Sequence, residues 1–185
     1  MAGIKSEILL EDIKLVNGVL QGNIESFNKI VNKYELMVLK FIYNMIKQRE
    51  AAEDITQEVF ITIYNKLEMY DKRHSFSNWI LQISKNKTID YIRKYKKVYE
   101  GNIDEAYDIS SQDMSPEEIA EYKEVKNNIK EYIKTLEDTD KQILILRYSE
   151  NLTFTDIAEI LGLTESTAKR RYYKIRENYK DFAKK

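Results

Sequence analysis

One proline and five glycines punctuate a chain of 185 residues, and this scarcity of helix-breaking residues is the feature that most constrains the fold. Sheet proteins need frequent turns built from such residues, and their strands alternate apolar with polar side chains. Alternating runs are few here, whereas apolar residues recur at the three- and four-residue spacing of a helix face. The sequence therefore predicts an all-α fold.

A single segment, residues 98–116, breaks the helical periodicity. It reads VYEGNIDEAYDISSQDMSP and contains no basic residue, while its acids are Glu100, Asp104, Glu105, Asp108 and Asp113. At its end, Ser115, Pro116 and Glu118 form a capping signal that predicts the start of a new helix. We therefore expect two small helical domains, 1–97 and 117–185, joined by a flexible acidic linker at 98–116.

Periodicity and turn signals predict eight helices in these two domains. Gly22, Asn151 and Gly162 mark tight connections between them. The expected helices lie near 9–20, 24–48, 51–67 and 77–97 before the linker, and near 116–135, 138–149, 154–161 and 165–180 after it.

Composition excludes several classes of site. Cysteine is absent and His74 is the only histidine, so disulfides, thiolate metal sites and imidazole clusters are ruled out. No stretch approaches the roughly 20 apolar residues of a membrane span, and acids interrupt the first apolar run. We expect a cytoplasmic protein with no membrane insertion, no metal and no cofactor.

Charge is segregated along the chain although the net charge is only −1. Residues 117–165 carry six basic and 12 acidic residues, whereas residues 166–185 carry eight basic and two acidic ones. Residues 1–97 carry 16 basic and 12 acidic residues. Such segregation creates local positive fields that a nucleic-acid backbone can feel.

The segment 153–176 has the pattern of a helix-turn-helix. Thr153 with Asp156 can cap a short first helix, Gly162 suits a turn with positive φ, and Thr164 can cap the second helix. The apolar stripes are Phe154, Ile157, Ala158 and Leu161 in the first helix, and Ala168, Tyr172, Ile175 and Tyr179 in the second. The opposite face presents Ser166, Lys169, Arg170 and Tyr173, with Arg171, Lys174 and Arg176 on its flanks. This face suits a DNA major groove; the alternative is a helical hairpin with a solvated basic end.

Two polar faces stand out in the first domain. Asp54, Gln57 and Glu58 share one face of the helix at 51–67, opposite the stripe through Ala52, Ile55, Val59, Ile63 and Leu67. The face fits a solvated surface, a partner surface or, with Glu53, an acid–base or metal site. Farther on, Gln82, Asn86, Asp90, Arg93 and Lys97 form a row beside Trp79, Tyr91 and Tyr95. That row suits exposed bases and phosphates, or else a core Trp with a solvated basic helix end.

Five strings of the sequence carry a resemblance to a known family. They are AEDITQEVF at 52–60, FSNWILQISKN at 76–86, IDYIR at 89–93, ILILRY at 143–148 and LTFTDIAEILGLTESTAKRR at 152–171. The first three resemble region two, and the last two region four, of the extracytoplasmic-function sigma factors. The family usually has Leu-Pro where this chain has Leu136-Glu137, and Val and Ser where it has Ala168 and Arg170.

The resemblance implies a non-enzymatic factor that brings core RNA polymerase to promoters and helps to open them. Its partners would be the β′ clamp helices and β flap of polymerase, promoter DNA and an anti-sigma factor. It assigns polymerase binding to Asp54, Gln57 and Glu58. It assigns minus-ten DNA to Asp71, Lys72, Arg73, Phe76, Trp79, Gln82, Asn86, Arg93, Lys94 and Lys97. It assigns minus-thirty-five DNA to Thr164, Ser166, Thr167, Lys169, Arg170, Arg171, Tyr173 and Lys174.

Two other functions compete with this interpretation. A helix-turn-helix regulator that never joins polymerase would share the C-terminal pattern but has no use for the face at 54–58. A metal-dependent hydrolase would use Glu53, Asp54 and Glu58, although no further acidic or imidazole cluster completes such a site.

Overall fold

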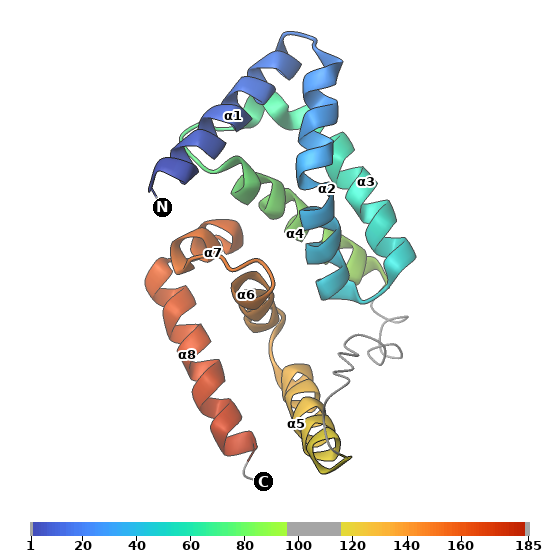
Figure 1. Cartoon of the computed structure of the whole chain (residues 1–185), viewed down its shortest axis with the longest axis vertical. Coiled ribbons are helices and arrows are strands. Elements are labelled where there is room, and N and C mark those ends of the chain that lie inside the picture. The colour runs from blue at the N-terminus through green and yellow to red at the C-terminus, as the bar shows by residue number, and fades with distance from the viewer. Residues whose placement is uncertain (1, 96–115, 184–185) are drawn as a thin grey trace. The chain divides into compact units, whose positions relative to one another are not determined.

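The computed structural model describes residues 2–95 and 116–183, and side chains within 9–95 and 122–183. These ranges contain eight α-helices, one short 3-10 helix and no strand, which confirms the all-α prediction (Figure 1). The chain divides into two compact units, 1–103 and 104–185. The division falls inside the expected linker, which lies outside the described residues except for Pro116, as does the capping residue Ser115.

The first unit is built around its second helix. It contains α1 (Ala2–Leu20), α2 (Ile24–Ile46), α3 (Arg49–Lys66), the 3-10 helix η1 (Leu67–Met69) and α4 (Phe76–Tyr95). Helix α2 packs against α1, α3 and α4, and α3 also packs against α4. Asn23 caps α2 by accepting a hydrogen bond from the Ser26 amide. The predicted stripe of α3, from Ala52 to Leu67, is buried throughout.

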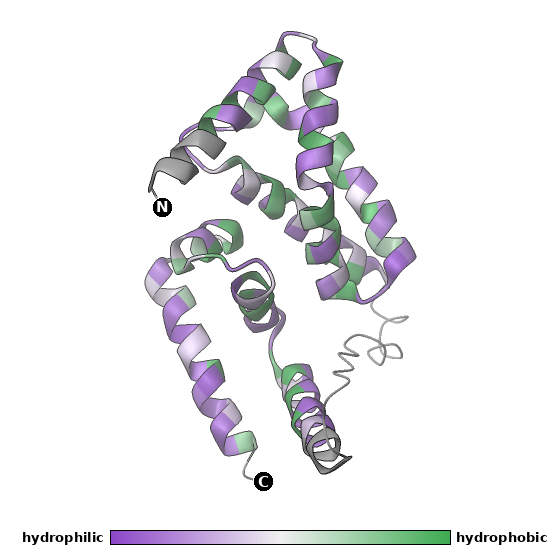
Figure 2. Ribbon diagram, in the orientation of Figure 1, coloured by the Kyte–Doolittle hydropathy of each residue, from purple (hydrophilic) through white to green (hydrophobic). Residues whose placement is uncertain are grey.

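The second unit is smaller and contains α5 (Pro116–Thr135), α6 (Asp138–Tyr148), α7 (Phe154–Leu161) and α8 (Glu165–Phe182). Helix α8 packs against the other three helices. Ile143 and Leu146 of α6 and Ile157 and Ile160 of α7 form the centre of its core. Green and purple alternate along the helices of both units in Figure 2, because each helix has an apolar and a polar side.

The predicted helix ends agree with the structure except at the start of the chain. Helix α1 begins at Ala2, seven residues before its predicted start, whereas every other helix end lies within two residues of its predicted position. Ile4 and Ile8 continue the helical apolar spacing toward the start of the chain and no proline interrupts it, so the prediction placed this start too late. Among the described residues, no helix combines the length and apolarity that a membrane span needs.

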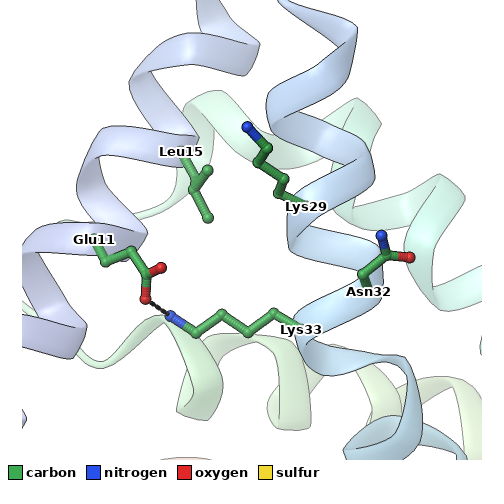
Figure 3. Close-up of a pocket in the computed structure, with 5 residues that line it drawn as sticks. All are labelled: Glu11, Leu15, Lys29, Asn32 and Lys33. Atoms are coloured by element: carbon green, nitrogen blue, oxygen red, sulfur yellow. Dashed lines mark hydrogen bonds and ion pairs between the residues drawn. The ribbon is translucent and has the colours of Figure 1, made fainter.

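A buried carboxylate ties α1 to α2. Asp12 is 2% exposed and accepts hydrogen bonds from Tyr34 Oη at 2.7 Å and Lys33 Nζ at 2.9 Å. Lys33 also donates to Glu11, a bond that crosses between the two helices in Figure 3. Burial and the bond to Asp12 raise the pKa of the Tyr34 hydroxyl, so it stays a donor. A buried carboxylate is tolerated here because each of its two oxygens accepts a hydrogen bond.

We expect Asp12→Asn to destabilise the protein by about 1–3 kcal/mol, because an amide can no longer pair with the Lys33 ammonium in a buried site. Urea unfolding measures this loss. The control is Glu11→Gln, which removes the exposed partner of the same lysine and should cost less than about 1 kcal/mol. Equal losses for the two variants would contradict this account.

Candidate functional site

The face of α3 that carries Asp54, Gln57 and Glu58 is exposed, as predicted. Glu58 Oε2 accepts a hydrogen bond from Lys87 Nζ of α4 at 3.1 Å. The same face continues into Ile61, which is 62% exposed, and Tyr64, which is 48% exposed. A polar half beside an exposed apolar half is typical of a surface that binds another protein.

The acidic residues of α3 do not form a catalytic or metal site. Glu53 pairs with Arg49 at 2.9 Å, and Glu58 pairs with Lys87. Among the described residues, no group of three potential metal ligands comes together. The open cleft between α1 and α2 is lined by Leu15, Lys29 and Asn32 around the Glu11–Lys33 pair, and these side chains provide no nucleophile with an adjacent base (Figure 3). Within the described residues, the acids of α3 thus do not provide the site that the hydrolase hypothesis requires.

The loop between η1 and α4 is held by its own side chains. Asp71 accepts hydrogen bonds from the backbone and side chain of Arg73, each at 3.0 Å from Oδ1, and this pairing holds the pKa of the Asp71 carboxyl far below its usual range. Tyr70 Oη donates to the His74 carbonyl at 2.6 Å. Lys72 Nζ donates to Asn17 Oδ1 of α1 at 2.5 Å. The loop is thus preorganised, and the Asn17 contact, 55 residues away in sequence, was missed by sequence reasoning.

Phe76 lies in the core and not on the DNA-facing surface that the resemblance implies for it. Its side chain is 0% exposed and stacks on Trp79 with ring centroids 5.7 Å apart. Tyr70 and Tyr34 contact it edge-on at 4.8 and 5.8 Å. A side chain with no exposed surface cannot contact DNA, so Phe76 supports the half-buried Trp79 instead.

Helix α4 presents the predicted polar row to solvent. Gln82, Asn86, Asp90, Arg93 and Lys94 are exposed, while Lys97 lies outside the described residues. Arg93 lies 3.9 Å from Asp90, a weak contact that leaves its guanidinium accessible. Tyr91 and Tyr95 pack together at 4.7 Å beside this basic end. Polar, basic and aromatic groups therefore follow one another along α4.

Helices α7 and α8 form the predicted helix-turn-helix. Thr153 and Asp156 make a complete capping box at the start of α7, and Thr164 Oγ1 accepts from the Thr167 amide at 3.2 Å at the start of α8. Gly162 adopts φ 68° and ends α7. Ala168, Tyr172 and Ile175 are buried, as the stripe predicted. Local sequence signals thus set both helices and the turn.

The outer face of α8 is polar and basic, and its cations differ in their partners. Thr164, Ser166, Lys169, Arg170, Tyr173 and Lys174 are exposed, and Thr167 is half-buried. Lys169 pairs with Glu165 at 2.5 Å, and Glu165 also accepts from Thr155 Oγ1 at 2.8 Å. Within the part of the chain that the structure describes, no ion pair engages Arg170 or Lys174. These two cations are therefore more available to an incoming anion than Lys169.

Arg171 points away from the predicted DNA face. Its Nε donates to Asp140 Oδ1 at 2.6 Å and its Nη2 to Glu137 Oε2 at 2.5 Å, both on the side of α6. The side chain is 30% exposed. The geometry therefore does not support the DNA contact that the sequence predicted for Arg171.

Comparisons with known proteins agree with the two-unit architecture. The family model described as Sigma-70 region 2 matches residues 30–98, and the model described as Sigma-70, region 4 matches residues 126–178. The chain is 31% identical over 172 residues to the ECF RNA polymerase sigma factor SigW of Bacillus subtilis, covering 89% of this chain and 92% of SigW.

Two solved structures share the fold. CnrH, solved in complex with the cytosolic domain of CnrY, gives a TM-score of 0.67 at 16% identity, covering 94% of this chain and 97% of CnrH. The sigma factor RpoE of Bartonella quintana, solved with the anti-sigma factor NepR, gives a TM-score of 0.62 at 18% identity, covering 86% and 98%.

Gly162→Ala should destabilise the second unit by about 1–2 kcal/mol, because a Cβ is strained at φ 68° although no atom would clash with it. Thermal unfolding measures the loss. Gly162→Asn is the matched control and should cost less, since Asn tolerates the left-handed region better than Ala. A stable Ala variant would show that the turn can relax to negative φ.

Proposed function

The chain belongs to the extracytoplasmic-function sigma factors, and from this membership we propose which of its surfaces bind polymerase and promoter DNA. As a sigma factor it directs core RNA polymerase to promoters and helps to open them, and it is not an enzyme. The observation that carries the assignment is the presence, in one chain, of the exposed α3 face and a helix-turn-helix with an exposed basic side. A transcriptional regulator that works without polymerase would need only the helix-turn-helix.

The polymerase-binding surface is the face of α3 around Asp54, Gln57 and Glu58, with the β′ clamp helices as its partner. These side chains are exposed on a helix whose other side is fixed in the core, so they are presented rigidly. Glu58 already pairs with Lys87. A basic partner would compete for that carboxylate, while Asp54 has no ion pair within the described part of the chain.

Minus-ten DNA binds along the loop at 71–75 and the exposed row of α4. Extruding a base from the duplex costs a few kcal/mol, which a preformed pocket can offset. The internal bonds of the loop support this role, because an ordered loop loses little entropy on binding. Trp79, Gln82 and Asn86 supply an aromatic surface and amide groups, and Arg93, Lys94 and Lys97 supply charge for phosphates.

Minus-thirty-five DNA binds the outer face of α8, with the residues near its start closest to the base edges. Arg170 is the best candidate for a base contact, because arginine can bind guanine O6 and N7 together and this guanidinium is not held by an acid of the described chain. Thr164, Ser166, Thr167, Lys169, Tyr173 and Lys174 surround it. The same domain provides the contact for the β flap.

The remaining assignments follow from the family. The acidic segment 98–116 is proposed as the linker between a polymerase-binding domain, 1–97, and a DNA-reading domain, 117–185. An anti-sigma factor is a proposed partner, since RpoE, which shares the fold, was solved with the anti-sigma factor NepR. A cytoplasmic location follows from the location of polymerase.

Asp54→Lys should weaken binding to core RNA polymerase at least tenfold while leaving the fold intact, because a reversed charge meets a basic partner with repulsion. Co-migration with core polymerase of Bacillus subtilis and fluorescence titration measure the affinity. Glu58→Lys should act in the same direction. Glu68→Lys, on an exposed acid of η1, is the matched control. Wild-type affinity in both α3 variants would refute the assignment.

Arg170→Ala should weaken binding to a specific duplex by the equivalent of about 1–3 kcal/mol and relax the preference at one base pair. The duplex is the one that the wild-type chain enriches from a random library. Lys180→Ala, near the far end of α8, should weaken specific and random duplexes alike and by less. Equal losses on both duplexes for Arg170→Ala would argue against base reading by this residue.

A further inference from the structure

We infer that Arg171 is a positioning residue of the recognition helix, and that Glu137 and Asp140 of α6 hold α8 in the orientation that presents Arg170 and Lys174 to DNA. This inference rests on the proposed role of α8 as the DNA-reading helix. Arg171 then no longer counts among the residues that contact minus-thirty-five DNA. Glu137 and Asp140 instead become residues on which DNA recognition depends without contacting DNA.

The contact has the geometry of a built clamp. The Arg171 guanidinium uses two different nitrogens for two different carboxylates, at 2.6 Å to Asp140 and 2.5 Å to Glu137. Such two-point pairing fixes direction as well as distance. Asp140 is only 19% exposed, so solvent and salt screen its half of the pair less than they screen a surface pair. The hydrogen bond to Asp140, then the one to Glu137, raises the pKa of Arg171.

The two acids sit at the end of α6 that suits negative charge. Glu137 is the residue that precedes α6, and Asp140 lies in its first turn, where free amide groups favour carboxylates. The Glu137 side chain makes no capping bond to its own helix. Its carboxylate therefore remains available for α8. The family usually has proline at the position of Glu137, and a proline could not make this ion pair with Arg171.

Two further contacts act on the same inner side of α8. Tyr132 Oη of α5 donates to the Ile175 carbonyl at 2.7 Å, one turn after Arg171. Tyr148 of α6 and Tyr172 share a hydrogen bond of 2.9 Å. Of these three contacts the Arg171 clamp lies nearest the start of α8, where base edges are read, and Glu165 in the first turn is tied to Thr155 of α7 as well. Because the residues of a helix keep fixed directions relative to one another, a rotation of α8 that released Arg171 would turn Arg170 away from its face by the same angle.

Neutralising Glu137 and Asp140 should change DNA affinity in opposite directions, depending on whether Arg171 positions α8 or contacts DNA itself. If Arg171 contacts DNA, Glu137→Gln with Asp140→Asn frees its charge and removes two repulsive acids, so DNA binding should tighten. If Arg171 positions α8, the same double variant should bind about two- to fivefold more weakly, the range expected for one well-formed ion pair. Binding is measured with the full chain on the enriched duplex and on a scrambled duplex of equal length.

Asp138→Asn is the matched control, since Asp138 lies in the same turn but is 89% exposed, and its one ion pair within the described residues is a contact of 3.9 Å with Lys141. It should bind DNA equally well or slightly better. Thermal unfolding gives a second readout: the double variant should melt about 4–8 °C lower, and Asp138→Asn, which loses only a favourable charge at the helix start, should melt lower by clearly less. A swapped variant, Arg171→Asp with Asp140→Arg, should recover part of both losses, which a DNA-contacting Arg171 could not do.

Tighter DNA binding by the double variant, or melting no lower than that of Asp138→Asn, would overturn the inference. Failure of the wild-type chain to bind either duplex would instead count against the proposed role of α8. In that case the melting temperatures and the swapped variant still decide whether the clamp exists.

Discussion

Burial of the apolar faces of α2 holds the first unit together, and the exposed surfaces of that unit exist because of it. Ile30, Phe41 and Ile42 of α2 are fully buried, and each such side chain contributes about 1.5–3 kcal/mol relative to exposure. Since α2 contacts α1, α3 and α4, these three helices turn their apolar stripes inward around it. The polar faces of α3 and α4 are then fixed outward, where a protein and a nucleic acid can reach them.

The second unit cannot rely on apolar burial to the same degree. Its α7 has eight residues, well below the length at which an isolated helix is stable in water. The capping box at Thr153 and Asp156 and the turn at Gly162 offset part of that cost through local bonds. Polar ties between helices, through Arg171 and Tyr132, then orient α8. A helix that must present a precise face benefits from such directional contacts more than from additional apolar area.

The sequence predicts well those features that depend on residues close together in the chain. Caps at Thr153 and Thr164, the turn at Gly162 and the stripe from Ala52 to Leu67 depend on neighbours within a few residues, and the structure has all of them. Pairing across helices could not be predicted in this way. Arg171 and Glu137 lie 34 residues apart, and periodicity cannot say which residue on the flank of a basic face turns back to an acid. Phe76, to which the resemblance assigns a DNA contact, lies inside, because its contacts with Tyr34 and Tyr70 also come from other elements.

Segregation of charge, and not the net charge of −1, is what allows this chain to carry the DNA-binding surface proposed for α8. Near the reading face, acids already engage Lys169 and Arg171, so the attraction of α8 for any DNA is reduced. This attraction does not depend on sequence, so its reduction weakens binding to specific and random duplexes alike and leaves discrimination to the base contacts. Two modest surfaces on one chain can still bind tightly when both are engaged together, because the second contact then forms at high effective concentration. On the proposed assignment, a chain with one DNA surface on α4 and another on α8 therefore has no need of a strongly basic composition.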